Sequence, residues 1–179
     1  MDIQRTLHLT YQDGHSRLNV TDADQQTVLY TVIRSSSKPQ LTIFRAATPY
    51  AAGVMIGKVT LHTWSSAIDL EIPGPPLTMQ KTSKLSSNYD VHGNNINWRW
   101  ERDRALTSDI RLVDYNGGSV LARFENASFS VKKQGTLTLF GTPTWEIFDA
   151  IIITGLAKIE QQKETSTRNS VAASSWAPK

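Results

Sequence analysis

The densest group of side chains that could bind a ligand lies between residues 98 and 111. It consists of Trp98, Arg99, Trp100, Arg102, Arg104 and Arg111. The planar guanidinium of arginine binds phosphate or carboxylate oxygens through paired hydrogen bonds, and an indole prefers the boundary between water and an apolar phase. With Trp64 as a further aromatic candidate, this composition favours an acidic phospholipid head group or another anionic ligand.

The same segment has a second interpretation that involves no ligand. Glu101, Asp103 and Asp109 nearly cancel the arginine charges. Trp98 and Trp100 are two residues apart, so in a strand they share one face, as core residues do. The segment could therefore consist of two core tryptophans beside a solvated loop of ion pairs.

A second candidate group surrounds His62, at the end of an expected strand. Asp69 and Glu71 follow on the next expected strand, so an imidazole and two carboxylates could meet at one mouth of a barrel. If the protein is an enzyme, His62, Asp69 and Glu71 could supply a general acid or base. A hydrogen-bonded structural histidine is the alternative.

Several kinds of chemistry have no support in the sequence. There are no cysteines, and the four histidines lack the spacing of metal ligands, so we expect no metal site. No glycine-rich phosphate loop or dinucleotide fingerprint occurs, so we expect no cofactor. The net charge of +3 comes from 19 basic and 16 acidic residues scattered along the chain, which does not favour nucleic-acid binding.

We expect a cytoplasmic protein without a transmembrane segment. The first residues contain no basic segment followed by an apolar run, which a secretory signal would require. The longest apolar stretch, Ile147 to Ile159, includes Asp149 and Lys158 and is shorter than the roughly 18 residues that a membrane span needs.

The first 140 residues have the alternating pattern of half-buried strands, interrupted by turn residues. The expected strands are Leu7 to Tyr11, Leu18 to Val20, Thr27 to Arg34, Gln40 to Ala46, Val54 to Thr63, Ala67 to Ile72, Tyr89 to Val91, Ile96 to Glu101, Asp109 to Asp114, Ser119 to Glu125 and Thr136 to Phe140. Gly57 indicates a bulge inside its strand, and Pro73-Gly-Pro-Pro76 marks the main internal loop. A meander is the simplest topology.

The pattern changes to a helix at residues 144–163. Thr144 can cap it, and Glu146 places a negative charge in the first turn. Apolar residues occupy nearly every direction around its first half, which is typical of a helix buried on all sides. We therefore predict one mainly β domain, residues 1–164, in which about twelve largely antiparallel strands form a closed barrel around this helix. Residues 165–179 are expected to be a disordered polar tail.

This order of elements resembles the tubby C-terminal-like superfamily, which includes tubby proteins, phospholipid scramblases and LURP-one-related proteins, and it is most similar to small fungal members. The residues that carry the resemblance are Trp98-Arg-Trp-Glu101, Asp109-Ile-Arg-Leu-Val-Asp114, Val120-Leu-Ala-Arg-Phe-Glu125 and Trp145 to Ala157. The resemblance implies a helix-filled barrel and, from tubby proteins, binding of phosphoinositides through basic residues on the barrel. Scramblase activity is not implied, because the chain lacks the cysteines that tether scramblases to membranes.

Three function classes remain open from the sequence, of which a structural or regulatory partner without a ligand is the residual one. The first is a ligand- or lipid-binding barrel that engages acidic lipid head groups or a protein partner through basic residues such as Arg99, Arg102, Arg104 and Lys132-Lys133. The second is a cofactor-independent isomerase or cyclase that acts on an apolar small molecule in fungal secondary metabolism. Because the helix fills the barrel, such an enzyme needs its pocket at a mouth or between loops.

Overall fold

Along each strand of this protein, apolar side chains alternate with polar ones and point toward a common interior. The computed structural model describes residues 4–46, 53–62, 65–93, 95–105, 107–127 and 133–175. Within these ranges the strands are β1 (Gln4–Gln12), β2 (Arg17–Thr21), β3 (Val28–Arg34), β4 (Leu41–Arg45), β5 (Val54–Leu61), β6 (Ile68–Glu71), β7 (Thr78–Lys81), β8 (Tyr89–Gly93), β9 (Ile96–Arg102), β10 (Ile110–Asp114), β11 (Val120–Asn126) and β12 (Lys133–Phe140). A 3-10 turn, η1 (Asp13–His15), joins β1 to β2, and the helix α1 (Trp145–Ser175) follows β12.

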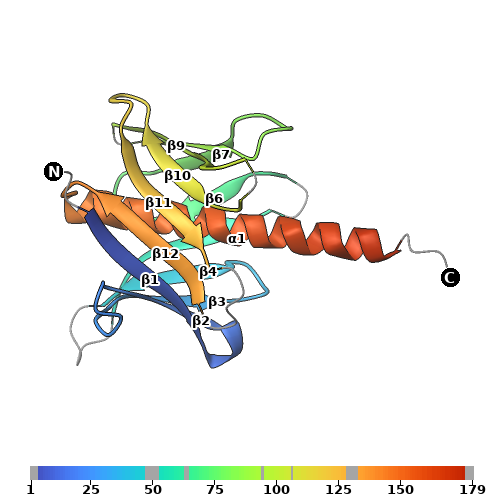
Figure 1. Cartoon of the computed structure of the whole chain (residues 1–179), viewed down its shortest axis with the longest axis horizontal. Coiled ribbons are helices and arrows are strands. Elements are labelled where there is room, and N and C mark those ends of the chain that lie inside the picture. The colour runs from blue at the N-terminus through green and yellow to red at the C-terminus, as the bar shows by residue number, and fades with distance from the viewer. Residues whose placement is uncertain are drawn as a thin grey trace.

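The twelve described strands form one closed antiparallel barrel (Figure 1). Each strand pairs with its neighbours in the sequence, and β1 closes the barrel against β12 over the register from Gln4↔Phe140 to Thr10↔Lys133. The predicted closed, antiparallel barrel and its meander topology are therefore confirmed. Among the described strands none is an edge strand, although β6 and β7 pair only at Ile68↔Met79, and such closure protects a sheet from edge-to-edge association.

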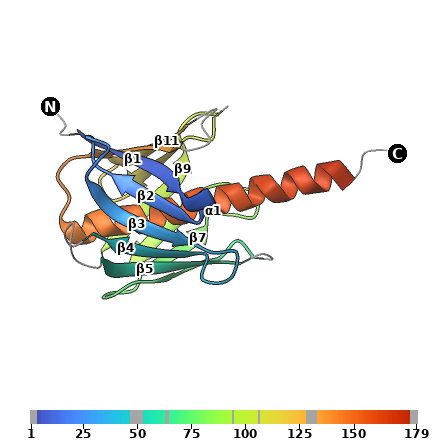
Figure 2. The same ribbon diagram turned by 90° about the horizontal axis from the view of Figure 1, so that it is seen from below.

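The first half of α1 runs along the inside of the barrel (Figures 1 and 2). Every residue from Ile151 to Ile159 is buried, including Thr154 and Lys158. The prediction of a buried helix is therefore confirmed, and its start is correct to within a residue, because the Phe148 amide donates to the Thr144 carbonyl at 2.8 Å. Within the described residues no helix is both long and apolar enough to cross a membrane.

Two glycines bring the helix close to the barrel wall. A Cβ on Gly57 in β5 would lie 3.1 Å from Cδ1 of Ile153, and a Cβ on Gly155 in α1 would lie 3.1 Å from the indole of Trp100. The predicted bulge at Gly57 is present. Ile43 of the partner strand β4 pairs with Gly57, whereas the next residue, Phe44, pairs with Met55, so the register shifts at this point. The missing side chains thus leave room for large neighbours on the opposite element.

The barrel has two different mouths. At the proximal mouth the helix begins, surrounded by the β2–β3, β6–β7 and β10–β11 loops. At the distal mouth the helix leaves, surrounded by the β3–β4, β7–β8 and β9–β10 loops. Since the strands are antiparallel neighbours, successive loops must alternate between the two mouths.

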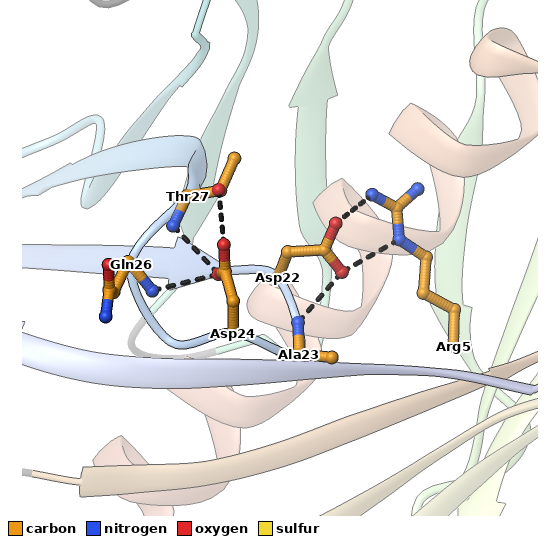
Figure 3. Close-up of polar contacts among 6 residues, drawn as sticks. All are labelled: Arg5, Asp22, Ala23, Asp24, Gln26 and Thr27. Carbon is orange, nitrogen blue, oxygen red and sulfur yellow. Dashed lines mark hydrogen bonds and ion pairs between the residues drawn. The ribbon is translucent and has the colours of Figure 1, made fainter.

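One ion pair and several hydrogen bonds fix the β2–β3 loop at the proximal mouth (Figure 3). Asp22 accepts two hydrogen bonds from the Arg5 guanidinium, at 3.2 and 2.5 Å, and Arg5 also lies over the Phe148 ring. Asp24 accepts from the amides of Gln26 and Thr27 and from the Thr27 hydroxyl. These hydrogen bonds hold the pKa values of both carboxyls below their ordinary range. Both carboxylates of this loop therefore form their hydrogen bonds within the protein.

Two details of the sequence prediction were wrong. The strand β7 was missed, because it has four residues of which Met79 is the only buried one. The helix was expected to end at residue 163, before a disordered tail, but it continues to Ser175 and projects from the distal mouth (Figures 1 and 2).

The extension needs no buried face, because the enclosed part of the helix is already formed and adding residues to it costs little. An ion pair of 2.6 Å between Arg168 and Glu164 and a hydrogen bond from the Thr165 hydroxyl to the Gln161 carbonyl support the exposed turns. Of the predicted tail, residues 176–179 lie outside the described residues.

Candidate functional site

The two tryptophans of the predicted Trp/Arg segment belong to the core. Trp98 and Trp100 are 5 % and 0 % exposed and point into the barrel. The Trp100 indole N–H donates to the Thr154 hydroxyl of α1 at 3.0 Å, so its polar atom is satisfied internally. These side chains position the helix and cannot contact a ligand outside the barrel. The third predicted aromatic contact, Trp64, lies outside the described residues.

Two of the four predicted arginines are neutralised by carboxylates. Arg99 donates to Asp90 at 2.6 Å and to the Tyr115 hydroxyl at 2.7 Å. Arg111 lies 2.7 Å from Glu101 and 3.8 Å from Asp103. The charge cancellation inferred from the sequence therefore holds for Arg111, whose partners Glu101 and Asp103 belong to the segment, whereas Arg99 is neutralised by Asp90 of the neighbouring strand β8.

Arg102 and Arg104 are different. The neighbouring carboxylates of Glu101 and Asp103 pair with Arg111 and Arg123, and not with them. Arg102 donates to the carbonyl of Ala105 at 3.1 Å, and both arginines are exposed. In the part of the chain that the structure describes, no carboxylate oxygen lies within 4.0 Å of either guanidinium. They lie at the end of β9 and in the β9–β10 loop, at the distal mouth.

Three lysines at the same mouth share this property. Lys81 and Lys84 belong to the end of β7 and the β7–β8 loop, and Lys81 Nζ donates to the Lys84 carbonyl at 3.1 Å. Lys158 on α1 donates to the Ser87 carbonyl at 2.7 Å. None of the three forms an ion pair with a carboxylate among the described residues. We call the set Lys81, Lys84, Arg102, Arg104 and Lys158 the basic rim.

Lys158 is the most unusual member of the basic rim, because its side chain is only 1 % exposed. Burial, together with the positive charges of Lys81 and Arg102, lowers its pKa to about 8. The ammonium lies 4.8 Å from the centre of the Tyr89 ring, whose buried hydroxyl has no hydrogen-bond partner among the residues that the structure describes. Burial raises the pKa of Tyr89 to about 12. Buried polar groups in proteins normally have a hydrogen-bond partner, so the Tyr89 hydroxyl has capacity for an added water or ligand.

Leu85 adds an apolar group beside the rim. It lies at the tip of the β7–β8 loop, next to Lys84, and its side chain is fully exposed. Isolated leucines are common on protein surfaces, but this one projects from a basic loop. Sequence reasoning identified Arg102 and Arg104 and missed Lys81, Lys84, Leu85 and Lys158. The signal that was overlooked is the run Lys81-Thr-Ser-Lys84-Leu85, two lysines and an apolar residue in a loop.

Of the three residues of the predicted acid–base group, the structure brings His62 and Asp69 together but not Glu71. His62 Nε2 and Asp69 Oδ2 are 2.6 Å apart, and His62 Nδ1 lies 3.4 Å from Lys38 Nζ. Glu71 instead pairs with Lys58 at 3.2 Å. The cavity beside His62 has a volume of only about 30 Å³, too small for a substrate. Within the described ranges, no three histidine or acidic side chains come together as metal ligands would.

A wider polar depression of about 810 Å³ lies between the emerging helix and β1, but its central charges satisfy one another. Arg34 forms two hydrogen bonds with Glu160, at 2.6 and 3.3 Å. Lys163 lies 4.0 Å from the same carboxylate and 4.4 Å from the centre of the Tyr11 ring. The basic rim is therefore the stronger candidate for an anion site.

The fold and the basic rim define a helix-filled β-barrel with an unneutralised cationic patch at one mouth. Comparisons of the chain with protein-family models, curated proteins and solved structures gave no match. The resemblance to the tubby-like superfamily stays a prediction.

Proposed function

We propose that this protein binds anionic lipid head groups at the surface of a membrane through the basic rim at its distal mouth. The observation that carries the proposal is the pairing pattern of the arginines. Of the ten arginines in the chain, all within the described residues, eight lie within 4.0 Å of a carboxylate oxygen. Of the two without such a partner, Arg102 lies close enough to Lys158 for its charge, like that of Lys81, to lower the pKa of that lysine, and Arg104 follows two residues later in the β9–β10 loop at the same mouth.

Like charges placed together without counterions raise the energy of the folded protein, so an anion that binds among them relieves a repulsion as well as forming new contacts. Arg102 and Arg104 offer planar donors for phosphate oxygens, and Lys84 offers a mobile ammonium. Each basic side chain near an anionic membrane surface contributes about 1 kcal/mol of attraction. Several such residues together are sufficient for measurable binding.

Leu85 favours a membrane over a soluble anion. A soluble phosphate compound needs only donors, whereas a membrane also offers an apolar phase next to its charged head groups. A fully exposed leucine beside Lys84 can enter the boundary between head groups and acyl chains while the lysines stay at the surface. Two different signals, charge and an apolar anchor, are what stable attachment of a peripheral protein requires.

The first prediction concerns the charges of the rim. The protein should sediment with phosphatidylcholine vesicles that contain phosphatidylserine or a phosphoinositide, and much less with phosphatidylcholine alone. The double variant Lys84→Gln/Arg104→Gln should weaken the binding by about 30-fold, because two contributions of about 1 kcal/mol are removed. Raising the salt concentration should weaken wild-type binding, since salt screens exposed charges.

A matched control removes the same amount of charge elsewhere. Arg17 and Lys58 are outside the rim, and both are paired with carboxylates. The double variant Arg17→Gln/Lys58→Gln should therefore bind like the wild type. Equal loss in both double variants would mean that net charge alone attracts the protein. Equal sedimentation with neutral and anionic vesicles at low salt would contradict the proposal.

The second prediction separates the membrane from a soluble anion. Leu85→Ser leaves every charge in place, and the exposed side chain has no packing to lose, so stability should be unchanged. Binding to anionic vesicles should fall by about tenfold, because part of a leucine's transfer free energy is lost. Binding to a soluble inositol phosphate, measured by calorimetry, should be unaffected. If Leu85→Ser binds vesicles like the wild type, the leucine does not enter the membrane.

A further inference from the structure

A second concave site lies at the proximal mouth, at the opposite end of the barrel from the basic rim. It is a pocket of about 280 Å³ between the first turns of α1 and the wall formed by β5 and the β6–β7 loop. Its lining is mainly apolar and includes Ile56, Ile72, Leu77, Ile96 and Ile153. Pro73 and Pro75 of the main internal loop also line it.

Asp149 provides a polar anchor in this apolar lining. The Tyr30 hydroxyl donates to its Oδ1 at 2.8 Å, and Arg45 lies 3.0 Å from its Oδ2. A carboxylate offers about four acceptor positions, so about two remain for a further donor after these contacts. Both partners hold the carboxylate in a fixed orientation at the edge of the pocket. Burial raises the pKa of Asp149 above its ordinary value, as expected for an acid in an apolar site.

The pocket opens through a collar of exposed apolar side chains. Val54 and Met55 line the pocket, Trp145 begins the helix at the same mouth, and each of the three is more than 40 % exposed. Trp145 is held in place by the Arg45 guanidinium and by the Phe148 ring. Exposed apolar groups that surround a concave apolar site are typical of a place where an apolar molecule enters.

We infer that the pocket of the proximal mouth binds a small, mostly apolar molecule that carries one hydrogen-bond donor, with the ring or chain in the apolar lining and the donor on Asp149. A cavity of about 150 Å³ accepts benzene, so a volume of about 280 Å³ suits a molecule of about a dozen non-hydrogen atoms. This inference is independent of the proposed lipid binding, because the two sites share no residue.

Indole and indene test both parts of the inference, because the two molecules have the same shape and only indole has an N–H donor. In amide NMR spectra of the full chain, indole should shift the signals of Ala150 and Ile153 in a saturable way, with a dissociation constant below about 1 mM. Indene should bind at the same place about tenfold more weakly, because it cannot donate to the carboxylate.

Two tryptophan variants, one at the pocket opening and one outside the pocket, test where indole binds. Met55→Trp places a large ring at the opening and should abolish the shifts caused by indole. Ile33→Trp adds the same ring at an exposed position of β3, outside the pocket, and should leave them unchanged.

Three outcomes would overturn the inference. The first is an absence of saturable shifts with indole, and the second is binding of indole that Met55→Trp does not affect. The third is a set of shifts at the collar that depends on protein concentration without any added molecule, which would assign this face to self-association. Vesicle binding should be unaffected by Met55→Trp, so failure of this inference is distinguishable from failure of the proposed lipid binding.

Discussion

Replacement of Ile152 by aspartate should prevent the protein from folding. Ile152 is 1 % exposed and lies near the start of the helical run, residues 151–159, that the barrel encloses on all sides. Losing a buried isoleucine costs about 2–5 kcal/mol, and a buried carboxylate without a partner adds several more. This sum is comparable with the whole stability of a typical domain, about 5–15 kcal/mol. Soluble expression should fall to background, as measured by the yield in the supernatant.

Two other variants make the result interpretable. Ile152→Val removes one methylene group, so it should fold and lose about 1 kcal/mol in urea unfolding. Ser166→Asp introduces the same charge on the same helix, but at an exposed position beyond the distal mouth, and should change stability by less than about 0.5 kcal/mol. If Ile152→Asp instead gave a folded protein of normal stability, the helix would not be enclosed by the barrel.

Replacement of Lys158 by methionine should make the protein more stable while it weakens vesicle binding. At pH 7 the folded protein holds a charged ammonium in a buried site, where its pKa is about 8 compared with an ordinary value of 10.5. The difference corresponds to on the order of 3 kcal/mol of destabilisation. Methionine fills a similar volume without the charge, although the hydrogen bond to Ser87 is lost. Urea unfolding at pH 7 should therefore show a gain for Lys158→Met.

The gain should depend on pH in a defined direction. Below pH 8 the lysine is protonated in both folded and unfolded chains, so the difference between variant and wild type is constant. Between pH 8 and 10.5 the unfolded chain binds more protons than the folded one, so the wild type becomes more stable as pH rises. The advantage of Lys158→Met should accordingly shrink over this range and nearly vanish above it. A difference independent of pH would show that the charge of Lys158 is not the cause.

Vesicle binding distinguishes a functional lysine from a merely tolerated one. Lys163 is a matched control, because burial also lowers its pKa to about 8, but it lies on Tyr11 and near Glu160. Lys158→Met should lower affinity for anionic vesicles by about fivefold, whereas Lys163→Met should not. Retaining a destabilising charge is typical of residues that serve binding. If both variants bound vesicles like the wild type, Lys158 would have no part in the site.

The strands and the helix start could be predicted because their causes are local. Alternation of apolar residues, turn residues such as Asp13-Gly14, and the change of period after Gly141 each depend on a few neighbouring positions. The strand β7 was missed for the same reason, since one buried residue in four gives no pattern. The extension of the helix to Ser175 was missed because its polar composition does not reveal that the barrel has already nucleated it.

The candidate site could be predicted only in part. Arg102 and Arg104 were identified from their residue type, and so were Arg99 and Arg111, which the fold pairs with Asp90 and Glu101. Sequence spacing could not separate these pairs, because the partners come from neighbouring strands and depend on register. Lys158 carried no signal at all, since its approach to the Ser87 carbonyl joins residues 71 positions apart.

By itself, the sequence determined the class of fold. A helix that is apolar on all sides must be enclosed, and a long series of half-buried strands can enclose it by closing into a barrel. Only the tertiary structure decided which cations remain without a carboxylate and where a pocket opens beside the helix. Periodicity is a property of neighbouring residues, whereas neutralisation of a charge depends on distances of a few ångströms between side chains that only the closed barrel brings together.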